Sequence, residues 1–90
     1  MAITGMDVEA VRAFARQLAA KADEIEAIAN GLTGQLDGVQ WIGADADNFR
    51  SEWQSSHRSQ LRTVAVALRD ASQTANGNAN QQEQASASVA

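Results

Sequence analysis

The sequence predicts an all-α fold, in which two long antiparallel helices form a hairpin. The first observation behind this prediction is composition. The chain has 90 residues and no proline, and 44% of its residues are hydrophobic. Many of these are alanine, the strongest helix former, whereas the β-branched residues are too scattered to build a sheet. The second observation is the helical spacing of apolar residues in both halves of the chain.

In the first half, apolar residues recur at intervals of three and four without a break. The line consists of Val8, Val11, Ala15, Leu18, Ala22, Ile25, Ala29, Leu32, Leu36 and Val39. A strict seven-residue repeat predicts a helix that packs on a neighbour with left-handed supercoiling. Thr4 or Asp7 can cap its amino end and Gly38 can stop it, so the helix is expected over about 7–37.

A turn is expected at 38–43, because glycines flank this segment and Gly43 can adopt backbone angles that other residues avoid. A second helix is expected over about 44–74. Its apolar line consists of Ala46, Phe49, Trp53, Leu61, Val64, Leu68, Ala71 and Ala75. Since the connection is short, the two helices are expected to lie side by side and antiparallel.

The composition changes after residue 75, where asparagine, glutamine and serine replace the large apolar residues. Such a segment buries too little surface to offset the entropy of ordering it. We therefore expect a hairpin domain at 1–75 and a disordered tail, or a frayed helix end, at 76–90.

One hairpin with so many alanines buries little apolar surface, and the sequence carries more apolar residues than one seam needs. Phe14 and Ile28 lie beside the first seam, and the second helix is apolar on more than one side around 64–68. Two hairpins that dimerise into a four-helix bundle would cover this surplus. Alternatively, these residues only widen the contact within one hairpin. The expected hairpin or dimer interface comprises Phe14, Leu18, Ile25, Ile28, Leu32, Phe49, Trp53, Leu61, Val64 and Leu68.

Several functions are disfavoured by charge and residue type. The net charge of −4 argues against a nucleic-acid partner, and no apolar run reaches the roughly 20 residues that span a bilayer. The chain has no cysteine and one histidine, His57, and no group of residues resembles a catalytic or metal site. We therefore expect no enzyme activity, no cofactor, no metal and no stable membrane insertion.

The expected turn reads Trp41-Ile42-Gly43 and lies between two amphipathic helices in a small acidic chain. This resembles the WXG-motif family, the ESAT-like substrates of type VII (ESX) secretion. The likeness covers roughly residues 3–75. It extends beyond the tripeptide, since Phe49 and Trp53 stand at large apolar positions similar to those of the family.

The resemblance implies a protein made in the bacterial cytoplasm and secreted without a cleaved signal peptide. It implies two kinds of partner. The first is a second hairpin, either another copy in a homodimer or a paralogous chain in a heterodimer, and the second is the ATPase of the secretion machinery. Family substrates often carry a tyrosine followed four residues later by an acid. This chain has no tyrosine, and Glu83 is the candidate acid of a degenerate signal. The alternative is a cytosolic coiled-coil adaptor or chaperone-like protein with no export role.

Overall fold

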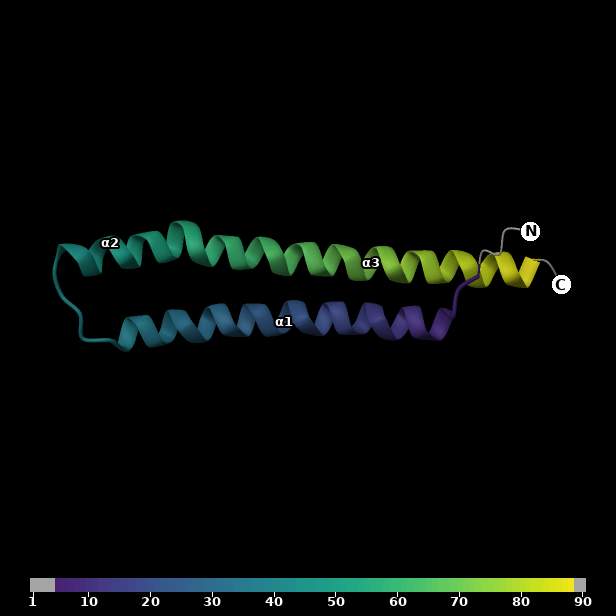
Figure 1. The fold of residues 1–90 in the computed structure, drawn as a ribbon, viewed down its shortest axis with the longest axis horizontal. Helices are drawn as coiled ribbons and strands as arrows, with labels where there is room; N and C mark the ends of the chain where they lie inside the picture. Colours follow the sequence, from purple (N-terminus) through teal and green to yellow (C-terminus); the bar gives the residue numbers. More distant parts are fainter. Residues whose placement is uncertain (1–4, 89–90) are drawn as a thin grey trace.

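Two antiparallel helical rods, joined by a short loop, make up the computed structural model (Figure 1), which describes residues 5–88. The first rod is α1 (Val8–Gly38). The second is continuous and consists of α2 (Ala44–Glu52), a π-helical turn η1 (Trp53–His57) and α3 (Arg58–Ser88). The hairpin measures 70 × 18 × 18 Å. The prediction of an all-helical, antiparallel hairpin is confirmed for the described residues.

The ends of α1 agree with the sequence signals to within one residue. The Asp7 carboxylate accepts a hydrogen bond of 3.0 Å from the Ala10 backbone N–H, and so caps the helix. Thr4, the other candidate cap, lies outside the described residues. At the other end, α1 stops at Gly38, and the Val39 N–H donates to the Leu36 carbonyl at 3.2 Å.

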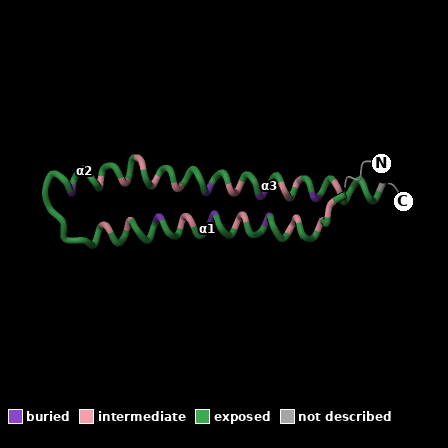
Figure 2. Tube along the Cα trace, viewed as in Figure 1, coloured by how far each residue is buried: buried purple, intermediate pink, exposed green. Residues whose placement is uncertain are grey.

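Small residues form the contact between the rods. The buried positions are Ala15, Ala22 and Ala29 on α1, Ala46 on α2, and Ala65, Ser72 and Ala79 on α3. Within α1 and within α3 they recur every seven residues, or about two helical turns, so each set forms a line along one face. No large side chain is fully buried among the described residues. Figure 2 shows these buried positions where the two rods face one another.

The predicted apolar line of the second helix is only partly correct. Val64 and Ala71 are exposed, whereas Ala65 and Ser72 are buried. The cause is η1, in which the Arg58 N–H donates to the carbonyl of Trp53, five residues earlier. Such a turn absorbs one extra residue and so shifts all later residues by roughly 100° around the helix.

Residues 76–88, for which a disordered tail or a frayed helix end was expected, continue α3 as a helix to Ser88. Residues 89–90 lie outside the described residues. The segment has no large apolar side chain, yet Ala79 is completely buried. The Ser72 hydroxyl, just before the segment, donates to the Ala15 carbonyl at 2.6 Å. Small residues therefore hold this part of α3 close to α1, which a count of large apolar residues misses.

The small-residue contact predicts that Ala22→Leu destabilises the hairpin, because a leucine cannot fit where the helices touch. We expect a loss of about 1–3 kcal/mol or more in the free energy of unfolding, seen as a lower midpoint in thermal melts followed by circular dichroism. The matched control is Ala20→Leu on the exposed face of α1. Equal midpoints for the two variants would contradict the packing described.

Candidate functional site

One long side of the hairpin is closed by polar bridges between α1 and α3. The Arg69 guanidinium contacts Asp23 and Glu26, both at 2.7 Å, and Arg58 donates to the Asn30 side chain at 2.9 Å. The hydrogen bond from Arg69 holds the pKa of Glu26 below its ordinary value. These contacts fix how far one helix is shifted along the other.

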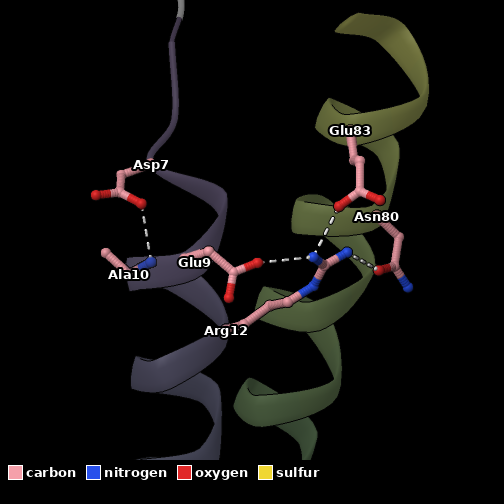
Figure 3. Close-up of polar contacts among 6 residues, drawn as sticks. All are labelled: Asp7, Glu9, Ala10, Arg12, Asn80 and Glu83. Atoms are coloured by element: carbon pink, nitrogen blue, oxygen red, sulfur yellow. Dashed lines mark hydrogen bonds and ion pairs between the residues drawn. The ribbon is translucent and has the colours of Figure 1, made fainter. Parts of the chain in front are cut away.

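A second polar bridge joins the amino end of α1 to the last turns of α3 (Figure 3). The Arg12 guanidinium lies 2.7 Å from Glu83 and donates to the Asn80 side chain at 2.9 Å. Glu9, one turn before Arg12, lies 3.4 Å away. The hydrogen bond with Glu83 raises the pKa of Arg12 above its ordinary value. Glu83, the candidate signal acid, is thus engaged within the chain.

The opposite long side carries exposed apolar side chains. Phe14 and Ile28 are 60% and 55% exposed, and each directly precedes a buried alanine of α1. We call the side that is closed by the bridges of Arg69 and Arg58 the polar side. Its residues Asp23 and Asn30 each directly follow a buried alanine of α1. Because successive residues turn by about 100°, these two sets point to opposite sides of the contact. By the same reasoning Val64, which precedes Ala65, belongs to the apolar side. We call this surface the apolar side.

A groove of about 250 Å³ opens at the loop end of the hairpin. Its lining residues are Leu32, Gln35, Leu36, Val39, Phe49 and Trp53. The indole N–H of Trp53 donates to the Thr33 hydroxyl at 2.8 Å, and that hydroxyl donates to the Ala29 carbonyl at 2.8 Å. These bonds hold the Trp53 ring in place as one wall. The groove continues the apolar side, since Leu32 and Phe49 are both substantially exposed.

The loop between the rods is held by Arg50. Its guanidinium donates to the carbonyls of Trp41, at 2.8 Å, and Val39, at 3.1 Å. The Trp41 ring packs against Phe49 with centroids 5.3 Å apart. Gly43 follows with φ 129° and ψ 179°, a conformation almost restricted to glycine. A Cβ there would meet no atom within 4 Å, so backbone conformation is the reason for glycine.

The structure divides the predicted interface residues into two groups. Phe14, Ile28, Leu32, Phe49 and Val64 are exposed, whereas Leu18, Ile25, Trp53, Leu61 and Leu68 are half-buried along the hairpin. Sequence reasoning missed two arginines that make contacts between distant parts of the chain, Arg12 and Arg50. Their partners lie 68 and 9 residues away, so no helical spacing signals either contact.

Within the described residues, no group of three or more histidine, cysteine, aspartate or glutamate side chains could hold a metal ion. No helix in that part of the chain combines the length and apolar character needed to cross a membrane. Comparison of the chain with family models, curated proteins and solved structures gives no match.

The Arg69 bridge predicts how stability depends on pH. The pKa of Glu26 is lower in the folded chain than its ordinary value of 4.5. Its contribution to stability is therefore present above that value and is lost as the pH falls through the folded pKa. In Arg69→Met, NMR titration should find the pKa of Glu26 near the ordinary value, and acid should lower the melting temperature less.

The control for this measurement is Arg16→Met, which removes an exposed arginine of α1 and should leave the Glu26 titration unchanged. A Glu26 pKa that is the same with and without Arg69 would show that the bridge does not form in solution.

Proposed function

We propose that the chain is a non-enzymatic interaction module that binds a second helical hairpin through its apolar side. It acts as a secreted substrate or partner subunit of a type VII secretion system. The observation that carries the pairing is that most of the exposed large apolar residues of the two rods lie on one side. Phe14, Ile28, Phe49 and Val64 are all at least 46% exposed.

The energetic argument for pairing is that the hairpin buries mainly alanines within itself. Full burial of a large apolar side chain contributes about 1.5–3 kcal/mol, and about half of the large apolar side chains of the described residues are exposed. A continuous exposed apolar surface typically marks an interaction site. A second hairpin laid on the apolar side would cover it and complete a four-helix bundle.

The secretion assignment is supported by the likeness to the WXG-motif family. Trp41, Ile42 and Gly43 occupy the loop between the two rods, and the Trp41 ring lies on Phe49. The hairpin partner is a second copy or a paralogous chain, and the further partner is the secretion ATPase. Because the chain lacks tyrosine, a paralogous partner would supply the complete signal.

The missing tyrosine also favours the second candidate function, a cytosolic adaptor or chaperone-like protein with no export role. The engagement of Glu83 by Arg12 points the same way, since a bound carboxylate is less available to a receptor. The two candidates share the apolar side and differ in where the protein is found.

Export is tested in the producing bacterium with an intact or deleted secretion ATPase. Under our proposal, the protein accumulates in the culture medium only when the ATPase is present, while a cytosolic marker stays inside. Retention in both strains, together with a stable cytosolic hairpin partner, would favour the adaptor instead.

Pairing through the apolar side predicts that Ile28→Glu prevents association without unfolding the hairpin. Ile28 is 55% exposed, so a carboxylate there is solvated in the single hairpin but buried at the interface, which is unfavourable. Light scattering should change from the mass of a pair to the 9.5 kDa of one chain, with helical circular dichroism still present.

The matched control is Val66→Glu. Val66 is 48% exposed but directly follows the buried Ala65, and so lies on the polar side. Equal loss of pairing in both variants would show that the apolar side is not the specific interface.

A further inference from the structure

We propose that the polar side carries a second docking site, where Arg58, Arg62 and Val66 bind an acidic helical segment of a partner protein. The three residues follow one another at intervals of four along α3, so they lie on one face of that helix. Val66 directly follows the buried Ala65, which places this face on the polar side. The site is separate from the proposed pairing, which uses the apolar side.

Arg58 and Arg62 carry charges that no carboxylate of the described residues matches within ion-pair distance. The neighbouring Arg69, by contrast, contacts two carboxylates at 2.7 Å. Arg58 donates to neutral side-chain amides, those of Gln54 at 3.2 Å and Asn30 at 2.9 Å. Arg62 is exposed and makes no hydrogen bond or ion pair within residues 5–88. Because two guanidinium groups one helical turn apart repel each other, an anion bound between them would be stabilising.

A hollow of about 260 Å³ opens beside these two arginines. It is lined by Gln54, Arg58, Ser59 and Arg62. Each of these side chains can donate a hydrogen bond, and none of them carries a negative charge. The oxygen of Gln54 accepts from Arg58, which leaves the NH₂ group of Gln54 as a donor. The chemistry of the lining therefore selects an oxyanion, and the carboxylate is the oxyanion that protein side chains supply.

A second hollow, of about 170 Å³, lies between α1 and α3 and shares the same two arginines. It is lined by Glu26, Ala29, Asn30, Arg58 and Arg62. Glu26 is the one acidic residue that lines either hollow, and its carboxylate is held by Arg69 at 2.7 Å. The charge of Glu26 is thus already compensated, so it does not neutralise the pair of arginines.

Val66 favours a polypeptide over a small anion as the ligand. Its side chain is 48% exposed and lies one turn beyond Arg62. A free phosphate would bind in the hollow and leave Val66 in water, whereas a docked helix would cover it. On a helix, carboxylates four residues apart are separated by about 6 Å along the axis, as are Arg58 and Arg62. An apolar residue one turn further along the partner helix would then meet Val66.

The second site gives the proposed interaction module two surfaces that can be occupied together. The apolar side and the polar side flank the contact between the two rods, so a hairpin bound on one does not cover the other. The apolar side would hold its partner by burial of large side chains. The polar side would add a weaker, salt-dependent contact that selects partners by charge.

Peptide binding to the full chain tests this site. The probe is a fluorescently labelled, alanine-based helical peptide with two glutamates four residues apart and a leucine one turn further. Anisotropy gives its dissociation constant, and NMR signals of the Arg58 and Arg62 guanidinium groups and of the Val66 methyl groups report where it binds. We expect Arg62→Gln to raise the dissociation constant about threefold to tenfold, because one guanidinium–carboxylate contact is lost. Circular dichroism reports that the variant stays folded.

The matched control is Arg16→Gln, which removes the same charge from an exposed position on the polar side. Arg16 lies ten residues before Glu26, or about 15 Å along α1, and should change the dissociation constant less than about twofold. Replacing both glutamates of the peptide by glutamine should abolish binding, and added salt should weaken the binding of the original peptide. Equal dissociation constants for Arg62→Gln and the wild type would overturn the proposal.

Two further outcomes separate this site from its alternatives. Ile28→Glu, on the apolar side, should bind the peptide as the wild type does. Loss of binding in Ile28→Glu but not in Arg62→Gln would assign the peptide to the apolar side and overturn the second site. Inorganic phosphate that shifts the arginine signals, combined with a peptide that leaves Val66 unchanged, would show a small-anion site and overturn the polypeptide partner. Pairing of hairpins is judged independently, by light scattering without peptide.

Discussion

The contact on which the rest of the structure depends is the line of small residues between α1 and α3. Ala15, Ala22 and Ala29 face α3 and are almost entirely buried. Where two helices meet through alanine, little space remains between them for large side chains. Leucine and isoleucine at the neighbouring positions must lie beside the contact, where each is covered on one flank only. The exposed apolar side is therefore a direct consequence of how closely the two helices pack.

The polar bridges on the other side have a different role. Exposed ion pairs contribute little to stability, typically about 0–1 kcal/mol, and those of Arg12 and Arg69 are partly exposed. They act mainly on alignment, since a shift of one helix along the other would break several of them together. A contact made of alanines alone would permit such shifts, because the helices would pack in a similar way at several positions along each other. The polar side thus fixes the register of the two helices, which the small residues cannot define. The apolar side remains available for a partner.

The regular part of this fold was predictable from the sequence, and the irregular part was not. Seven-residue spacing fixed the face of α1, and the Asp7 cap and Gly38 set its ends to within one residue. The face of α3 that contacts α1 could not be predicted from the spacing of apolar residues. The reason is that the π-helical turn η1 inserts one residue without a distinctive sequence signal. The sequence left residues 76–88 open between a disordered tail and a frayed helix end, because the support for their helix comes from Ala79 and from Arg12, neither of which belongs to a large apolar pattern.

The extra residue absorbed by η1, which displaced the predicted apolar line of the second rod, also determines the shape of the groove. Ala46 and Ala65 are 19 residues apart, which on a regular α-helix would place them about 100° apart. Absorbing one residue in η1 brings both onto the face that contacts α1, and both are fully buried. If the rod were a regular α-helix with Ala65 in its present place, Phe49 would point about 160° away from α1. The groove would then lose a wall. One inserted residue therefore couples the close packing of the two rods to the shape of the surface that a partner meets.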